Sequence, residues 1–354
     1  MRGRGRRRGR VRWHGPGAWS AVVAIGLLLS SCSRTGVTVE PEVMFALPSA
    51  AAGCGGAVAL GGGAARVPIT VSTVSGQVAE MVNVCLEGKG PYPFVIDTGA
   101  GQSTIDTALA DRLHLAPDGP SVEFAGLGCT GRAQPVDVKG WSVAGVTLAP
   151  QLLTAATLPG IGRRGDPVGL LGSDVLSRFG ALRMDFEAQT LTFGGPEGPV
   201  PGQSIPVRGP TGPPPPAVLT GGRAGTTVPL IVTLAPGNVA LNVRLRFGRG
   251  PYRGFVVDTG SSQSVVVTFA AKVEKLAGSE LAQRQSTVCS VITVPLVHSG
   301  PWSLPGVMLH PQLIGETDFG PISSGGIEGL LGSDQLARYG WVIFDYTGGR
   351  LVVG

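Results

Sequence analysis

The chain has 354 residues, enough for two domains with a core in each. Charged residues make up 14% of the sequence and hydrophobic residues 43%, which excludes a chain that stays disordered through excess charge. Seven of the 28 basic residues are N-terminal arginines, so the rest of the chain has 21 basic against 23 acidic side chains, and a nucleic-acid-binding function loses its support.

The N-terminal residues have the pattern of an export signal. The arginines precede an apolar run, residues 21–29, that is too short to cross about 30 Å of hydrocarbon but fits the core of a signal peptide. The run ends at Leu29-Ser30-Ser31-Cys32, which resembles a bacterial lipobox. A plain secretory signal, or a basic tail with a chance cysteine, are the alternatives. We expect residues 1–31 to be removed and a lipid on Cys32 to anchor the protein to the outer face of the cytoplasmic membrane, in the cell envelope.

Two segments of the chain predict connections rather than folded domains. Residues 32–66 are rich in alanine and glycine and are predicted to form a flexible tether, with a propeptide as the alternative. Residues 194–226 contain four consecutive prolines and many glycines, which predicts an interdomain linker. The remaining segments, residues 67–193 and 227–354, are the predicted N-terminal and C-terminal lobes.

Each lobe is predicted to consist mainly of short strands. In the first lobe, runs rich in β-branched and aromatic residues occur at residues 67–71, 82–86, 94–96, 122–124, 182–186 and 191–193. Two short helices are predicted at residues 108–113 and 174–179, the second with Ser173 as its N-cap and Gly180 at its end. Many short strands with few helices predict a closed or sandwich-like β-lobe, and two such lobes leave a cleft between them.

The two lobes repeat one another. The segment Phe94-Val95-Ile96-Asp97-Thr98-Gly99 returns 161 positions later as Phe255-Val256-Val257-Asp258-Thr259-Gly260. The segment Gly169-Leu170-Leu171-Gly172-Ser173-Asp174 returns unchanged at residues 329–334, 160 positions later. The sequence therefore predicts a duplicated lobe.

Asp97 and Asp258 are the candidate catalytic residues. Each follows an apolar run and precedes Thr-Gly, so each carboxyl is expected at the end of a buried strand. One such motif is typical of an Asx turn, but two copies in duplicated lobes can meet about a pseudo-two-fold axis. Two adjoining carboxyls cannot both ionise, and such a pair can activate a water against a peptide carbonyl.

The two motifs resemble those of the pepsin and retropepsin superfamily of aspartic proteases. They read Asp97-Thr98-Gly99-Ala100 and Asp258-Thr259-Gly260-Ser261, each followed by a Leu-Leu-Gly, and the resemblance extends over most of both lobes. It implies an all-β, bilobal fold with the active site in the interlobe cleft and a peptide or protein substrate. It also implies that the threonines hydrogen-bond across the axis and that the Leu-Leu-Gly segments cross behind the catalytic loops. The residues expected to support the dyad are Thr98, Gly99, Thr259, Gly260 and Ser261.

A glycine-rich segment between these motifs is the candidate flap. It consists of Gly126, Leu127, Gly128, Cys129, Thr130 and Gly131. It matches the dinucleotide-binding pattern G-x-G-x-x-G, but Pro135 and the strand-like residues that follow oppose the helix that this pattern requires. A hairpin tip fits better, and the resemblance implies a flap that closes over substrate. The equivalent residues 286–293 contain no glycine, so we expect a single flap.

The flap contains no tyrosine of the kind that pepsin-like enzymes place over the dyad. Ser261 stands where the first motif has Ala100. A hydroxyl beside a carboxylate stabilises its ionised form, so we expect Ser261 to support Asp258 and the pH optimum to be less acidic than that of pepsin.

The other repeated acids are predicted to be structural. Asp174 and Asp334 lie at the start of a predicted helix, where the helix dipole favours a carboxylate, and Asp185 and Asp345 end a strand beside a turn. Four cysteines downstream of Cys32 allow three disulfide pairings, among which the sequence does not choose; they are Cys54, Cys85, Cys129 and Cys289. The histidines are scattered, so we expect no metal and no cofactor.

Two functions fit these observations. The first is an exported, monomeric aspartic endopeptidase. The alternative is a catalytically inactive envelope lipoprotein that binds peptides or a protein partner in the same cleft, because a fold does not guarantee the chemistry of its relatives. Retention of both aspartates, both threonines and a glycine-rich flap favours the endopeptidase.

Overall fold

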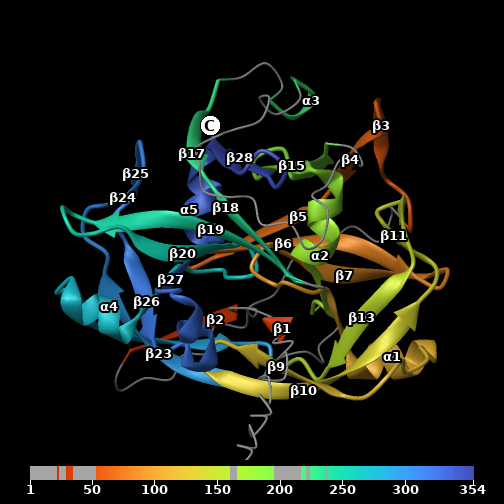
Figure 1. The fold of residues 1–354 in the computed structure, drawn as a ribbon, viewed down its shortest axis with the longest axis horizontal. Helices are drawn as coiled ribbons and strands as arrows, with labels where there is room; N and C mark the ends of the chain where they lie inside the picture. Colours follow the sequence, from red (N-terminus) through yellow and green to blue (C-terminus); the bar gives the residue numbers. More distant parts are fainter. Residues whose placement is uncertain are drawn as a thin grey trace, which may run out of the picture.

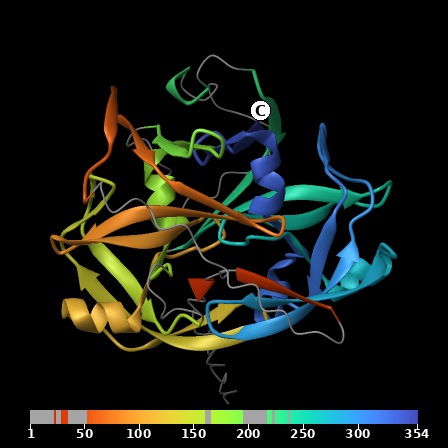
Figure 2. The ribbon, with the colours of Figure 1, turned by 180° about the vertical axis from the view of Figure 1, so that it is seen from behind.

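A computed structural model describes residues 22–23, 29–34, 53–159, 166–194, 217–220, 224–235 and 238–354. In these residues the chain forms two β-lobes joined by a third sheet, as Figures 1 and 2 show from opposite sides. The predicted all-β, two-lobed architecture is therefore confirmed.

The first lobe is built on an 11-stranded sheet. Ten strands lie in the order β1-β9-β10-β13-β8-β14-β7-β6-β11-β12, and the eleventh, β5, also pairs with β6. Its strands are β1 (Val22–Val23), β5 (Thr70–Val74), β6 (Gln77–Leu86), β7 (Lys89–Asp97), β8 (Thr104–Asp106), β9 (Val122–Gly126), β10 (Cys129–Val138), β11 (Trp141–Val143), β12 (Val146–Leu148), β13 (Gln151–Ala156) and β14 (Gly169–Gly172). The predicted helix at residues 108–113 is present as α1 (Thr107–Leu113), and the Asp106 carboxyl caps it by accepting from the N–H of Ala108.

The second lobe repeats this topology from β9 onward, with the order β22-β23-β26-β21-β27-β20-β19-β24-β25 and β18 beside β19. At the end of this order β2 pairs antiparallel with β22, whereas β1 pairs parallel with β9. Its strands are β2 (Leu29–Arg34), β18 (Ile231–Ala235), β19 (Asn238–Phe247), β20 (Arg253–Asp258), β21 (Val265–Val267), β22 (Ala277–Ser286), β23 (Val291–His298), β24 (Trp302–Leu304), β25 (Val307–Leu309), β26 (Leu313–Thr317) and β27 (Gly329–Gly332). Its helical segments are α4 (Thr268–Val273), η3 (Gly320–Gly325), α5 (Ser333–Leu336) and η4 (Ala337–Tyr339). The duplication predicted from the sequence is thus a duplication of topology.

A seven-stranded sheet joins the lobes, with the order β17-β29-β28-β15-β16-β4-β3. Its strands are β3 (Val58–Gly61), β4 (Ala64–Pro68), β15 (Ala181–Asp185), β16 (Thr190–Phe193), β17 (Thr226–Pro229), β28 (Trp341–Asp345) and β29 (Arg350–Val353). The two halves meet where β15 pairs antiparallel with β28, from Ala181↔Asp345 to Asp185↔Trp341. The two lobes therefore share main-chain hydrogen bonds.

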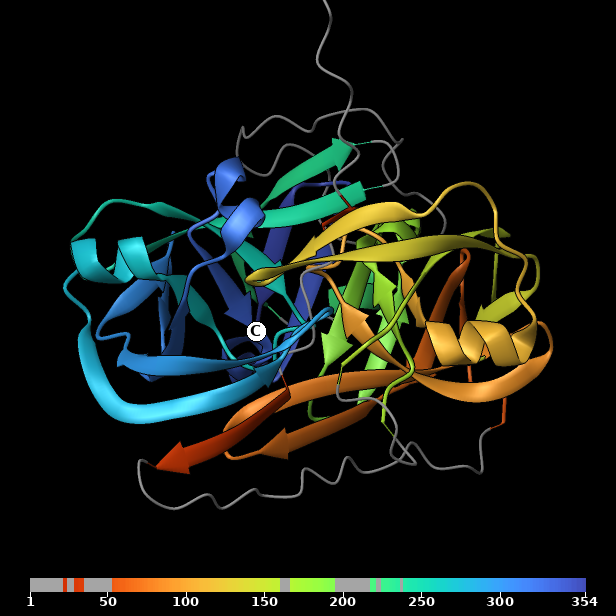
Figure 3. The ribbon, with the colours of Figure 1, turned by 90° about the horizontal axis from the view of Figure 1, so that it is seen from below.

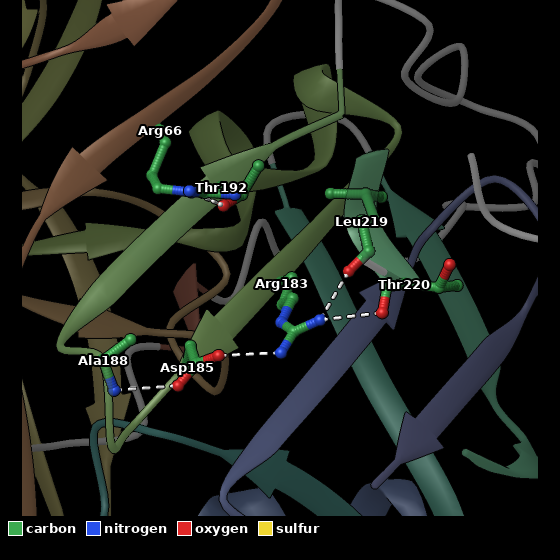
Figure 4. A network of polar contacts seen from close by, with 7 residues as sticks. All are labelled: Arg66, Arg183, Asp185, Ala188, Thr192, Leu219 and Thr220. Carbon is green, nitrogen blue, oxygen red and sulfur yellow. Dashed lines mark hydrogen bonds and ion pairs between the residues drawn. The ribbon is translucent and has the colours of Figure 1, made fainter. Parts of the chain in front are cut away.

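Polar contacts join β15, the central strand of this sheet, to the segment between the lobes (Figure 4). The Arg183 guanidinium donates to the carbonyls of Leu219 and Thr220, at 3.0 Å each, in the short helix α3 (Ala217–Thr220). The same group pairs with the Asp185 carboxylate at 2.7 Å and stacks on the Trp341 ring. Asp185 also accepts from the N–H of Ala188 in the hairpin turn, and Asp345 accepts from Gly348 in the equivalent turn, so both acids are structural, as predicted.

The predicted tether extends too far toward the lobes. Residues 53–66 are described as ordered structure: β3 and β4 pair with each other, β4 pairs with β16, and Cys54 forms a disulfide with Cys85 of β6. The prediction of a flexible tether is wrong for these residues because a disulfide and a sheet edge supply the stabilisation that the alanine-rich and glycine-rich sequence lacks. The strand predicted at residues 67–71 is likewise divided between β4 and β5.

Most of the predicted export signal and of the predicted linker lies outside the described residues. Two strands lie within residues 1–34. β1 pairs parallel with β9, and β2 pairs antiparallel with β22, with Cys32 opposite Gln283. Removal of the signal and lipidation of Cys32 stay predictions. No helix among the described residues is both long and apolar enough to span a membrane.

The second predicted helix is shorter than expected and has a different N-cap. It consists of α2 (Ser173–Leu176) followed by the 3-10 turn η2 (Ser177–Phe179), and it ends at Gly180 with φ 68°, as predicted. Gly172, not Ser173, is the N-cap, and no side chain caps the helix. The Ser173 hydroxyl has other partners, which lie in the candidate active site.

Candidate active site

The two candidate aspartates end equivalent strands. Asp97 is the last residue of β7 and Asp258 the last residue of β20. Each strand pairs in parallel with the Leu-Leu-Gly strand of its lobe, so that Gly172 of β14 lies beside Asp97 and Gly332 of β27 beside Asp258. The Leu-Leu-Gly segments therefore lie directly behind the catalytic loops, as the resemblance implied.

The first glycine of each of these strands is required by packing. A Cβ on Gly169 would collide with the ring of Phe94, and a Cβ on Gly329 would collide with the ring of Phe255. Both phenylalanines are fully buried and precede the aspartates by three residues. Each apolar strand is thus pressed against its neighbour, which fixes the position where the carboxyl emerges.

The threonines join the two loops by reciprocal hydrogen bonds. The Thr98 N–H donates to Thr259 Oγ1 at 3.0 Å, and the Thr259 N–H donates to Thr98 Oγ1 at 3.1 Å. Each hydroxyl then donates across the axis to a main-chain carbonyl of the other lobe, Thr98 to Val257 at 2.8 Å and Thr259 to Ile96 at 2.6 Å. All four bonds are buried, so the loops are fixed in register, as the resemblance implied.

The two carboxyls lie against each other's loops. A Cβ built on Gly99 would collide with the carboxyl of Asp258, and one built on Gly260 would collide with that of Asp97. Only glycine leaves room for this approach. Both aspartates are fully buried, and the Oδ2 atom of each has no hydrogen-bond donor among the described residues. The structure thus brings together the pair that the sequence singled out.

Main-chain donors orient the other oxygen of each carboxyl. Asp97 Oδ1 accepts from the N–H groups of Gly99 at 3.0 Å and Ala100 at 2.7 Å, and Asp258 Oδ1 accepts from the N–H of Ser261 at 3.0 Å. The Ser261 hydroxyl donates to the carbonyl of Gln263. The expected hydroxyl support of Asp258 is therefore wrong, because the turn that follows the motif satisfies this hydroxyl within the chain.

Burial raises the pKa of both carboxyls. Burial raises the pKa of Asp97 to about 7, although the N–H of Ala100 opposes the shift. Burial, and then the charge of Asp97, raise the pKa of Asp258 well above its usual value. Two acids this close release their protons in separate steps, so the pair passes through a state that holds one proton.

A second pair of acids supports the loops from behind. Asp174 Oδ1 accepts from the N–H and hydroxyl of Ser103, and Asp334 Oδ1 accepts in the same way from Ser264, with all four distances between 2.7 and 2.9 Å. Each serine hydroxyl also accepts from the N–H of the glycine that ends Leu-Leu-Gly. Both acids are structural, as predicted. The two serines were missed, although the repeat of Gln-Ser after the two motifs could have revealed them.

The predicted flap is a hairpin with a two-residue turn. Gly126 ends β9 and pairs with Cys129 at the start of β10, and Leu127 and Gly128 form the turn, where Gly128 has φ 67°. Leu127 is fully buried in the main core. The glycine-rich pattern thus predicted the hairpin correctly. Thr130 and Gly131 continue along β10, opposite Ala125 and Phe124.

A hairpin of the second lobe meets this first-lobe hairpin, contrary to the expectation of one flap. It is formed by β22 and β23, and its turn contains Val288 and Cys289 (Figure 3). Cys289 forms a disulfide with Cys129, and Val288 is buried in one cluster with Phe124 and Ala100. The absence of glycine did not prevent this turn, because the hydroxyl of Thr287 forms hydrogen bonds across it to the main chain of Ser290.

The described residues contain no cluster of three or more His, Cys, Asp or Glu side chains that could hold a metal ion. The two disulfides, Cys54–Cys85 and Cys129–Cys289, account for all four cysteines whose pairing the sequence left open.

Comparisons with known proteins relate the first lobe to aspartyl proteases. An aspartyl protease family model matches residues 82–175, which include Asp97 and its Leu-Leu-Gly strand. Among solved structures, the crystal structure of basic 7S globulin from soybean has a TM-score of 0.41 with this chain and 12% identity, covering 82% of this chain and 94% of the globulin chain. A search of curated proteins found no match.

Proposed function

We propose that the protein is an aspartic endopeptidase that hydrolyses peptide bonds through a water activated by Asp97 and Asp258. The observation that carries this proposal is that each carboxyl lies against the glycine of the other loop, at one buried point between the lobes. The family match over residues 82–175 supports it independently for the first lobe.

The chemistry follows from a pair that shares one proton. The ionised carboxylate removes a proton from a water molecule as the water oxygen attacks the peptide carbonyl carbon. The protonated carboxyl donates its proton to the carbonyl oxygen, which gives a neutral tetrahedral diol. The carboxyl that took the proton from water then gives it to the nitrogen, while the other carboxylate removes a proton from a diol hydroxyl. The carbon–nitrogen bond breaks, and the products are a carboxylic acid and an amine. Both carboxyls return to their starting state, so no cofactor is consumed.

Substrate access requires the two hairpins to move. Both aspartates are fully buried, and the hairpin turns are joined by Cys129–Cys289. An extended peptide therefore reaches the carboxyls only when the joined hairpins lift together or when their disulfide is absent. The apolar surroundings, which include Phe124 and Val288, favour a peptide with hydrophobic side chains beside the bond that is cut.

The test is cleavage of peptide libraries by the purified protein and by two variants, Asp97→Asn and Asp258→Asn. An asparagine has nearly the same shape but cannot exchange a proton with water in this way, so each variant should lose at least about 99.9% of kcat. Both variants must keep the circular dichroism spectrum of the wild type. Full activity in either variant would exclude the proposed mechanism.

A non-catalytic peptide-binding protein is the second candidate, and the closed hairpins favour it. It would bind peptides or a protein partner without cutting them. A statine-type inhibitor, which resembles the tetrahedral diol, separates the two functions. An active carboxyl pair should bind it at least about 100-fold more tightly than the matching peptide, whereas a binding protein should bind both alike.

We also propose that the protein is exported as a monomer and anchored at the cell envelope through Cys32. The basic segment, the apolar run and the lipobox-like residues support this proposal. Two disulfides are in keeping with an oxidising compartment. Mass spectrometry of the mature N-terminus would test it, because a lipidated Cys32 adds the mass of its acyl chains, and an unmodified earlier residue would exclude the anchor.

A further inference from the structure

A serine hydroxyl contacts the threonine carbonyl of each candidate catalytic loop. Ser173 Oγ donates to the carbonyl of Thr98 at 2.9 Å, and Ser333 Oγ lies 3.2 Å from the carbonyl of Thr259, to which it can donate. The two serines are equivalent in the repeat, and each is the first residue of the short helix after Leu-Leu-Gly. They therefore fix the main chain immediately after the two aspartates.

The second contact of each serine comes from the opposite lobe and differs between the two. The Tyr346 hydroxyl lies 2.8 Å from Ser173 Oγ. The Glu80 Oε2 atom lies 2.8 Å from Ser333 Oγ. Glu80 is on β6, against which α5 packs, and it is fully buried. The catalytic chemistry proposed above makes no use of this acid.

The repeat shows that the acid takes the place of a missing hydroxyl. Phe186 corresponds to Tyr346, because β15 and β28 pair symmetrically and each residue follows the aspartate that ends its strand. A phenylalanine offers Ser333 no polar partner. At the position that corresponds to Glu80, β19 has the buried residue Leu241, as the registers Met81↔Val95 and Asn242↔Val256 establish. The polar group is thus supplied by a tyrosine in one half and by a glutamic acid in the other.

Ser333 can hydrogen-bond to both Thr259 and Glu80 in only one protonation state of Glu80. A serine hydroxyl has one proton, and Ser333 faces two acceptors if the carboxyl is ionised. The carboxylate would take that proton, and the Thr259 carbonyl would lose its donor. A neutral Glu80 instead donates to Ser333 Oγ, which leaves the serine proton for Thr259, as the tyrosine hydroxyl does for Ser173.

The surroundings of Glu80 favour the neutral acid. Its Oε1 atom is buried and has no hydrogen-bond partner among the described residues, which is costly for an ionised carboxylate. Burial raises its pKa to about 8, the Ser333 hydroxyl opposes the shift, and the negative charge of Asp334 on α5 adds to it. Asp334 is the charged neighbour that acts on this carboxyl among the described residues.

We propose that Glu80 is a positioning residue that, as a neutral acid, donates to Ser333 and thereby holds the main chain at Thr259 beside the second catalytic aspartate. This inference rests on the proposed function for its effect on cleavage, but the hydrogen-bond arrangement does not depend on it. Ionisation of Glu80 withdraws the support. Glu80 touches neither substrate nor water in this role.

The test exchanges the two kinds of donor. Glu80→Leu reproduces the residue of the other half and removes the donor, so kcat should fall about five- to tenfold with little change in KM, as expected for one lost hydrogen bond. Glu80→Gln keeps a donor and should retain at least about half of the activity. Adding Phe186→Tyr to Glu80→Leu restores a hydroxyl by the symmetry of the repeat and should recover activity, whereas Phe186→Tyr alone should match the wild type. Equal activity of Glu80→Leu and the wild type would overturn the proposal.

Hydrogen–deuterium exchange of the main chain at residues 258–262 provides a readout that needs no activity. In the wild type these amides should exchange faster above about pH 8, after correction for the intrinsic rate, and in Glu80→Gln they should show no such step. If the protein cuts no peptide but shows this step, the proposed function is excluded and the positioning role of Glu80 is supported. If the protein cuts peptides but the wild type and Glu80→Gln show the same exchange, the proposed function is supported and the positioning role of Glu80 is excluded.

Discussion

Replacing Asp97 by asparagine should stabilise the protein at neutral pH and not in acid. The folded protein binds the Asp97 proton more tightly than the unfolded chain does, because burial raises the pKa from 3.8 to about 7. Between these pH values the unfolded chain has lost the proton and the folded protein keeps it. The free energy of unfolding therefore falls as pH rises and levels off above about pH 7.

The size of the effect follows from this interval. Over about three pH units, at about 1.4 kcal/mol for each, the wild type loses about 4 kcal/mol that Asp97→Asn does not lose. The variant also removes the charge that raises the pKa of Asp258, which acts in the same direction. The difference in unfolding free energy between variant and wild type should thus grow by a few kcal/mol from about pH 3 to about pH 8.

Urea unfolding at several pH values measures this difference directly. Asp118→Asn is a matched control, since Asp118 lies exposed in a loop of the same lobe, and its curve should follow the wild type at every pH. A constant offset between Asp97→Asn and the wild type over this range would show that the carboxyl is not held protonated by burial, and the shared-proton mechanism would lose its basis.

Two further predictions concern access and protonation. The double variant Cys129→Ser and Cys289→Ser should raise kcat/KM for long peptides, because the hairpins then open separately, whereas the Cys54→Ser and Cys85→Ser pair should leave it unchanged. Urea unfolding should show that the first pair costs about 1.5 kcal/mol more stability, since its cysteines are 160 residues apart and those of the second pair 31; lower kcat/KM without the first disulfide would indicate that it positions substrate. In a pH–rate profile, kcat/KM should fall below about pH 7 as the pair gains its second proton, because burial raises the pKa of Asp97 to about 7 and that of Asp258 well above its usual value; a peak near pH 2 would contradict this.

The strands and the candidate pair were predictable because they depend on local pattern and on the repeat. An apolar run before Asp-Thr-Gly predicts a buried strand and a turn wherever it occurs, and two copies at one spacing predict two equivalent loops. The glycine-rich residues from Gly126 predict a hairpin for the same local reason. The reciprocal hydrogen bonds of Thr98 and Thr259 fix the two loops in register. The family resemblance predicted these bonds, whereas the local sequence pattern did not.

The errors arose where distant segments decide the outcome. Residues 53–66 are ordered by Cys85 and by β16, which lie far away in the sequence. The sheet that joins the lobes requires β15 to pair with β28, and the sequence of each lobe taken alone does not predict this pairing. The Ser261 hydroxyl was assigned to the nearest carboxylate, but the carbonyl of Gln263 is the acceptor that the turn presents to it.

The two halves differ in contacts that lie near the axis between them, where Ser173 contacts Tyr346 and Ser333 contacts Glu80. Some contacts made within one half are the same in both, such as those of Ser103 with Asp174 and of Ser264 with Asp334. Contacts that cross between the halves can differ, as the partners of Ser173 and Ser333 do, although the reciprocal bonds of Thr98 and Thr259 are the same on both sides. A pair with one ionised and one protonated carboxyl does not need this difference, because the repulsion between two adjoining carboxyls already separates their proton-release steps. We expect Tyr346 and Glu80 instead to give the two loops different supports, of which the one at Thr259 is lost when Glu80 ionises.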